Sequence, residues 1–209
     1  MPGRSLLLFR RAGSWRLGAL LLVLLQSGSD LAAESSAPQV TCSVIVTTNY
    51  YTVTGATPHE ISASMLQARP WKTSATFDAF TTWDTRWNYK SAMEDGEFLL
   101  ESFEAQTKVV ITLPRWIPPT NAAPWVKERW WKFATGLTLH EQGHLALARQ
   151  ATAELQRQIS ALKPFASARE LRRVVNQTAD QVIDKFREAD RAYDRETNHG
   201  TKQGAVLIW

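Results

Sequence analysis

A single apolar stripe through residues 124–162 constrains the fold of this chain more than any other feature. Between Pro124 and Pro164, apolar side chains recur at steps of three and four residues, which predicts one long helix packed against a core. The stripe consists of Trp130, Phe133, Leu137, His140, His144, Leu147, Ala151, Leu155, Ile159 and Leu162. Asn121 is the predicted N-cap, and Gly136 is a candidate position for a bend.

Three ionisable residues interrupt this stripe in the segment LTLHEQGHLAL, residues 137–147. On a helix, His140 and His144 project from one face, so both imidazoles can reach a single ion at about 2.0–2.1 Å. Glu141 lies beside them, where it can act as general base for a zinc-activated water. This spacing, H-E-x-x-H, is the signature of zinc metalloproteases. The sequence therefore predicts one zinc ion bound by His140 and His144, with Glu141 as the catalytic residue.

A catalytic zinc ion also needs a third protein ligand and an open position. His199 is the first candidate, because an antiparallel second helix, predicted over residues 167–192, would bring the segment YDRETNHG back toward the ion. Asp194 and Glu188 are the next candidates, and His59 is interpreted as a surface residue. The alternative for the whole cluster is hydrogen-bonded core histidines or an exposed patch. Its place on the apolar stripe favours a metal, because buried polar groups without partners cost several kcal/mol.

Residues 1–33 are predicted to be a signal peptide. Four arginines precede an uncharged apolar run, residues 17–25, and Leu31-Ala32-Ala33 offers a small-residue cleavage site. The run is shorter than the roughly 20 residues that span a bilayer, although an uncleaved membrane anchor is the alternative. Residues 34–39 are predicted to be a linker and residues 40–209 a single domain. The domain is expected in the periplasm or outside the cell, without stable membrane association after cleavage.

Removing the predicted leader changes the charge balance. The full chain has 24 Lys and Arg against 20 Asp and Glu. The leader contains four basic residues and one acidic residue, so the remainder carries 20 basic against 19 acidic residues. The high pI therefore gives no reason to expect nucleic acid as a partner. Cys42 is the only cysteine, which excludes an intramolecular disulfide.

Strand patterns fill the first half of the predicted domain. Residues 40–55 are rich in Val, Thr, Ile and Tyr, which predicts one or two strands, and residues 58–68 have the pattern of a short helix. Residues 75–91 and 98–114 show alternating patterns around Glu94-Asp95-Gly96, which predicts a β-hairpin. The predicted fold class is α+β: a small, mostly antiparallel sheet followed by two long helices. The metal is expected between these helices, on a zincin-like HExxH helix.

Several motifs together resemble one known family and cover most of the chain after the leader. They are Tyr51-Thr52-Val53-Thr54-Gly55, Thr82-Trp83, Trp87-Asn88-Tyr89, Thr112-Leu113-Pro114, HEQGH, and YDRETNHG followed by Gln203-Gly204. On these motifs the chain is similar to the bacterial predicted secreted zinc-dependent proteases called domain of unknown function 922. The resemblance implies a zinc hydrolase with His140, His144 and His199 as ligands and Glu141 as the base.

The predicted function is a secreted zinc-dependent metallohydrolase, a peptidase acting on peptide or protein substrates. An edge of the strand pair 75–113 could bind an extended peptide by adding a strand. Tyr193 is either a group that stabilises the oxyanion or a packing residue at a helix end. Two other functions compete with the peptidase. One is a non-catalytic secreted binding or structural module, with a structural metal site or none. The other is a zinc amidase acting on cell-wall peptides.

Overall fold

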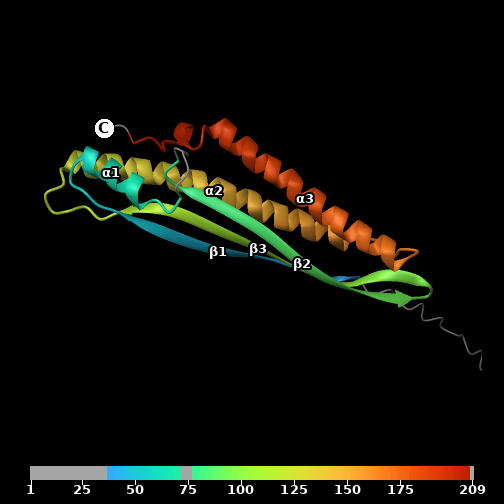
Figure 1. The fold of residues 1–209 in the computed structure, drawn as a ribbon. Helices are drawn as coiled ribbons and strands as arrows, with labels where there is room; N and C mark the ends of the chain where they lie inside the picture. Colours follow the sequence, from blue (N-terminus) through green and yellow to red (C-terminus); the bar gives the residue numbers. More distant parts are fainter. Residues whose placement is uncertain (1–36, 72–76, 208–209) are drawn as a thin grey trace, which may run out of the picture. The chain divides into compact units, whose positions relative to one another are not determined.

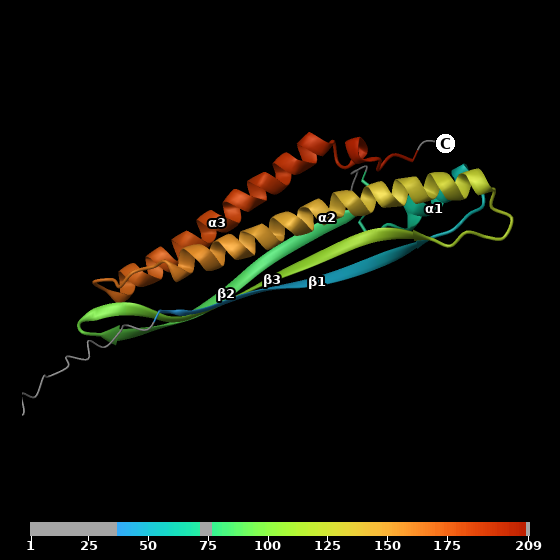
Figure 2. The same cartoon turned by 180° about the vertical axis from the view of Figure 1, so that it is seen from behind.

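The computed structural model describes residues 37–71 and 77–207, and these residues form the α+β fold that the sequence predicts (Figures 1 and 2). The predicted signal peptide, residues 1–33, lies outside the described residues. The predicted linker, residues 34–39, lies partly outside them, and its last residue already begins a strand. The elements are β1 (Gln39–Val53), α1 (Pro58–Ala68), β2 (Phe80–Glu94), β3 (Glu97–Trp116), α2 (Pro124–Ser160), α3 (Ala168–Thr197) and the 3-10 turn η1 (Thr201–Gln203).

The three described strands form a mixed sheet in the order β1-β3-β2. β2 and β3 form the predicted antiparallel hairpin, and its turn at Asp95 and Gly96 has positive φ angles of 51° and 83°. The prediction of a mostly antiparallel sheet is wrong, because β1 pairs with β3 in parallel. The hairpin folds back so that β3 lies between β2 and β1. This position suits β3, whose alternate residues from Phe103 to Leu113 are all buried.

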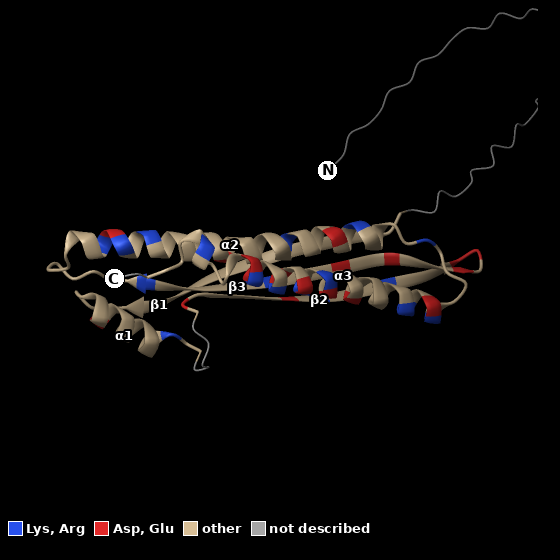
Figure 3. Ribbon diagram, turned by 90° about the horizontal axis from the view of Figure 1, so that it is seen from above, with Lys and Arg blue, Asp and Glu red and all other residues tan. Residues whose placement is uncertain are grey.

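Helix α2 lies along one face of the sheet, and α3 packs against α2 in the antiparallel direction (Figures 1 and 2). Two apolar clusters fill the interior, one around Phe133 and Val109 and the other around Leu155 and Phe103. Basic and acidic side chains are interspersed along both helices (Figure 3). None of the helices in the described part of the chain is long and apolar enough to cross a membrane.

Helix α2 is continuous, as the apolar stripe predicts, but two details differ from the expectation. The N-cap is Ala123, which makes no side-chain capping bond, and the predicted cap Asn121 lies outside the helix. Proline at the first helical position needs no N–H partner, so this end forms without a polar cap. The helix also runs through Gly136 without a break. A Cβ at Gly136 would lie 2.3 Å from the backbone carbon of Gly204. The lack of a side chain at Gly136 therefore allows the C-terminal segment to pack against α2.

Helix α3 ends at Thr197, five residues beyond the end of the predicted span of residues 167–192. Ser167 caps its N-terminus by accepting a hydrogen bond from the backbone N–H of Glu170 at 3.2 Å. The apolar pattern ends near Phe186, but polar contacts to α2 continue the packing to Thr197. The helix stops where Asn198 enters the left-handed region at φ 50°. Asp194 therefore lies on the helix, although the predicted helix ended at residue 192.

Candidate metal centre

Helix α2 places His140, Glu141 and His144 on its buried face. Their exposed fractions are 4%, 3% and 5%, so the three ionisable side chains are as buried as the apolar residues of the stripe. Four residues make about one helical turn, and the two imidazole rings accordingly lie 4.8 Å apart at their centroids. Ionisable groups at this depth require specific partners. The prediction that the two rings share one buried face is confirmed.

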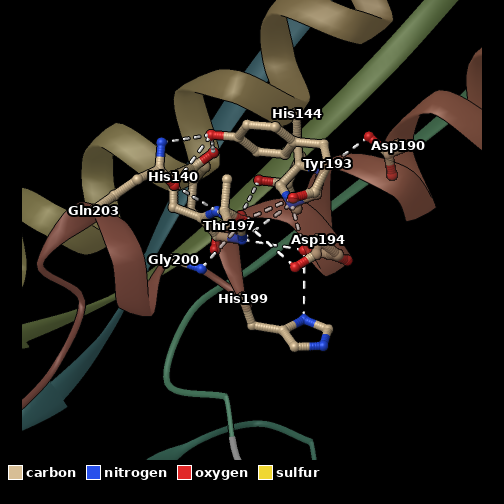
Figure 4. A network of polar contacts seen from close by, with 11 residues as sticks. His140, His144, Asp190, Tyr193, Asp194, Thr197, His199, Gly200 and Gln203 are labelled. Atoms are coloured by element: carbon tan, nitrogen blue, oxygen red, sulfur yellow. Dashed lines mark hydrogen bonds and ion pairs between the residues drawn. The ribbon is translucent and has the colours of Figure 1, made fainter.

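The two rings meet a carboxylate from α3 (Figure 4). Nε2 of His140 and Nε2 of His144 lie 3.1 and 3.2 Å from Oδ1 of Asp194, and the two nitrogen atoms lie 3.2 Å from each other. Ligand atoms in a tetrahedral zinc site with bonds of about 2.0–2.1 Å are about 3.3 Å apart. The triangle therefore has nearly the dimensions that three zinc ligands need, and imidazole nitrogens with a carboxylate oxygen are suitable donors for zinc.

The outer nitrogen of each ring faces an oxygen acceptor. Nδ1 of His144 lies 2.8 Å from Oδ1 of Asp190, and Nδ1 of His140 lies 3.0 Å from Oε1 of Gln203. Carboxylate and carbonyl oxygens only accept hydrogen bonds, so each contact favours a proton on Nδ1. In the neutral rings, both Nε2 atoms then direct lone pairs toward the oxygen of Asp194. Three acceptors converging at this distance need a cation or a shared proton between them.

The pKa shifts of His144 and Asp194 agree with the need for a proton or a cation between these atoms. Burial lowers the pKa of His144, but the hydrogen bonds to Asp190 and Asp194 outweigh burial and raise it to about 10. Burial raises the pKa of Asp194, but its contacts with His140 and His144 outweigh burial and hold it well below the usual range. Without a metal, the cluster thus retains a proton on His144. A metal ion bound there would have to displace that proton, which makes binding dependent on pH.

Glu141 has a separate partner on the sheet. The hydroxyl of Thr81, on β2, donates a hydrogen bond of 2.5 Å to Oε2 of Glu141. Burial raises the pKa of this carboxyl, while the hydrogen bond from Thr81 and the nearby His144 and His140 oppose the increase. The net shift is upward, which is the direction required of a general base or acid working near neutral pH. Thr81 fixes one carboxylate oxygen and so orients the group.

Tyr193 covers the other side of the histidine pair. Its ring stacks on His140 with centroids 5.1 Å apart and an interplanar angle of 11°. Its hydroxyl donates to the backbone carbonyl of His140 at 3.2 Å and accepts from the amide of Gln203 at 2.9 Å. A Cβ at Gly143 would lie 2.1 Å from this hydroxyl, which explains a glycine within HEQGH. These contacts are those of a packing residue, the second of the two interpretations of Tyr193.

The other candidate ligands lie farther from the cluster. His199 has a side chain that is 60% exposed, and its Nδ1 lies 3.4 Å from Oδ1 of Asp194, the position at which Figure 4 shows it. Glu188 forms ion pairs with Arg191 and Arg195, and its side chain is 58% exposed. His59 is exposed at the start of α1. The structure therefore brings the second-ranked candidate, Asp194, between the two histidines and leaves His199 at the rim.

The sequence assigned no role to Thr81, Asp190 or Gln203, although Gln203-Gly204 is one of the motifs behind the family resemblance. One signal was available for Asp190, because it precedes Asp194 by four residues and so repeats the spacing of His140 and His144. Thr81 alternates with Trp83 on the inward side of its strand, but this pattern identifies a face and not a partner.

Comparisons with known proteins give one result. A family described as "Bacterial protein of unknown function (DUF922)" matches residues 48–200, which include the histidine pair, Glu141, Asp190 and Asp194. Neither the comparison with curated proteins nor the comparison with solved structures returned a match. Since the match covers most of the chain, the protein belongs to the DUF922 family of bacterial proteins.

Proposed function

We propose that this protein is a zinc-dependent metallohydrolase that cleaves peptide bonds. The observation that carries the proposal is the convergence of two imidazole nitrogens from α2 and one carboxylate oxygen from α3 at 3.1–3.2 Å, beside the buried Glu141 on α2. His140, His144 and Asp194 are the proposed ligands of one zinc ion, and His199 is the alternative third ligand. When bound, zinc supplies a Lewis acid that lowers the pKa of water and polarises the substrate carbonyl.

Glu141 is the proposed general base. Its ionised carboxylate takes a proton from the water that attacks the carbonyl carbon, and delivers the proton to the leaving amide nitrogen as the C–N bond breaks. Burial makes this carboxylate more basic than an exposed one, because the raised pKa strengthens its hold on a proton. The hydroxyl of Thr81 holds Oε2 in place during the transfer.

The neighbouring strand supports a peptide as the substrate class. Among the described strands, β2 lies at an edge of the sheet, since β3 separates it from β1, and it carries the threonine that contacts Glu141. An edge strand can pair with an extended peptide through backbone hydrogen bonds. A peptide added to β2 would run past the glutamate with its backbone extended. The same geometry suits a cell-wall peptide, so peptide libraries and cell-wall fragments are both suitable test substrates.

Zinc content and one conservative variant test the proposal. The protein, purified without chelators, should contain about one zinc ion per chain and hydrolyse peptides. Glu141→Gln should retain zinc and lose hydrolysis, because the amide cannot accept the proton. Glu128→Gln, an exposed glutamate on the same helix, is the matched control and should retain both. Zinc without hydrolysis by the wild type would favour a structural site in a binding module, and protein free of zinc would reject the proposal.

Export is a second part of the proposal, motivated by the leader pattern of residues 1–33. We expect the mature chain to begin at or near Glu34. N-terminal sequencing of the protein from a cell fractionation checks this. An intact Met1 on protein in the soluble cytoplasmic fraction would reject export.

A further inference from the structure

We propose that Gln203 is a positioning residue for His140. By accepting a hydrogen bond from Nδ1, it keeps the ring proton on that atom and directs the lone pair of Nε2 to Asp194 and His144. The inference rests on the proposed function for its effect on zinc, but its effect on the ring can be measured without a metal. It also extends the site beyond residue 200, where the match to the family ends.

The amide of Gln203 is held in one orientation by its second partner. Its Oε1 lies 3.0 Å from Nδ1 of His140, and its Nε2 donates to the hydroxyl of Tyr193 at 2.9 Å. That hydroxyl can donate in turn to the backbone carbonyl of His140, which completes a closed set of donors and acceptors. With the amide reversed, an NH₂ group would face Nδ1 and the ring proton would move to Nε2. A proton on Nε2 would occupy the ligand position, so the orientation of this amide matters for metal binding.

The chain places Gln203 there through a turn that fits closely against α2. The backbone N–H of Gln203 donates to the carbonyl of Gly200 at 2.8 Å, which closes the 3-10 turn. Gly200 has a φ of 81°, and a Cβ there would lie 3.0 Å from Cβ and Cγ of His140. The turn therefore approaches the ring through a position that only glycine fills without strain.

Thr197 provides a weaker second acceptor for the same nitrogen. Its hydroxyl lies 3.3 Å from Nδ1 of His140 and already donates to the carbonyl of Tyr193 at 2.7 Å. It can therefore accept from Nδ1–H, although at a longer distance than Gln203. Loss of Gln203 should therefore weaken the preference for a proton on Nδ1 of His140 without abolishing that preference.

The counterpart at the other ring is Asp190, which holds His144 through a charged hydrogen bond. His140 has instead an uncharged acceptor, which restrains the ring without adding a further negative charge near Asp194. The two rings are thus oriented toward Asp194 by different partners: Asp190 on α3 orients His144, and Gln203 on the turn after α3 orients His140.

The test compares three variants of the purified protein. Gln203→Leu removes the acceptor at similar volume, Gln203→Glu keeps an acceptor, and Lys202→Leu is the control at the exposed neighbouring position of the same turn. The first measurement is the tautomer of His140 in the metal-free protein, from nitrogen-15 chemical shifts and ring couplings at a pH where the ring is neutral. The second is zinc affinity, from competition with a chromophoric chelator.

We expect the wild type, Gln203→Glu and Lys202→Leu to hold His140 with its proton on Nδ1. Gln203→Leu should show a mixture of tautomers and bind zinc about 10- to 100-fold more weakly, the range for loss of a group that orients a ligand. A proton on Nε2 in the wild type, or a Gln203→Leu protein with wild-type tautomer and wild-type affinity, would overturn the inference. If no variant, wild type included, binds zinc, the proposed function fails, while the tautomer measurement still decides the role of Gln203.

Discussion

Replacing Gly143 by alanine tests whether Tyr193 packs against α2 as the structure shows. The new Cβ would lie 2.1 Å from the tyrosine hydroxyl and 2.2 Å from the ring carbon that bears it, so the ring must move. Moving it sacrifices the stack on His140, worth about 0.5–1.5 kcal/mol. It also breaks the hydrogen bonds of the hydroxyl to His140 and Gln203, worth about 1 kcal/mol each. The combined loss is about 2–4 kcal/mol.

Alanine also favours the helix by about 1 kcal/mol relative to glycine. We therefore expect Gly143→Ala to lower the free energy of unfolding by about 1–3 kcal/mol, which is also the usual range for overpacking. Urea unfolding of chelator-treated protein, followed by circular dichroism, measures this change without a contribution from metal binding.

A second background separates the clash from other effects of the substitution. In Tyr193→Ala protein the ring is absent, so Gly143→Ala should raise the free energy of unfolding by about 1 kcal/mol through helix propensity alone. The sign of the effect should therefore reverse between the two backgrounds. If Gly143→Ala stabilises the protein that retains Tyr193, the ring does not lie on Gly143 and the account of this contact is refuted.

Three further predictions concern the groups around the histidines. Asp190→Ala should weaken zinc binding about 10- to 100-fold, because His144 loses the group that orients it. Asp184→Ala, at an exposed site on the same helix, is the control and should bind zinc as the wild type does, with both affinities measured by chelator competition. In metal-free protein the pKa of His144 is raised to about 10, so its stabilising effect is complete below the unfolded value near 6.5 and is lost as pH rises toward 10. Urea unfolding from pH 6 to 10 should show this decline, and His144→Ala should flatten it. Thr81→Val should lower the free energy of unfolding by about 1–3 kcal/mol, because the buried Glu141 loses its donor, and equal stability of the variant would contradict that role.

The parts of the fold that follow a repeating pattern were predictable from the sequence. The alternation along β2 and β3 and the turn at Asp95-Gly96 specified the hairpin. The apolar period of three and four specified α2 and placed His140 and His144 on its buried face. The neighbours of a strand are not specified in this way. Alternation fixes which side chains face the core but not which strand lies alongside, so the parallel pairing of β1 with β3 was missed.

The partners of the histidines depended on tertiary register. The apolar face of α3 ends near Phe186, and the polar residues that follow resemble a loop when the helix is judged by its apolar period alone. Their packing against α2 extends the helix and turns Asp190 and Asp194 toward the rings. Gln203 lies in a 3-10 turn flanked by Gly200 and Gly204, and its contact with His140 spans 63 positions in the sequence. No local pattern encodes such a contact.

X-ray absorption at the zinc edge of the zinc-loaded protein tests the central claim most directly, because it counts the imidazoles bound to the ion. The account predicts two imidazoles, from His140 and His144, with oxygen ligands that include Asp194. A spectrum with three imidazoles would contradict the assignment of Asp194 in favour of His199. A spectrum with none would show that the convergent nitrogens on α2 do not hold the metal.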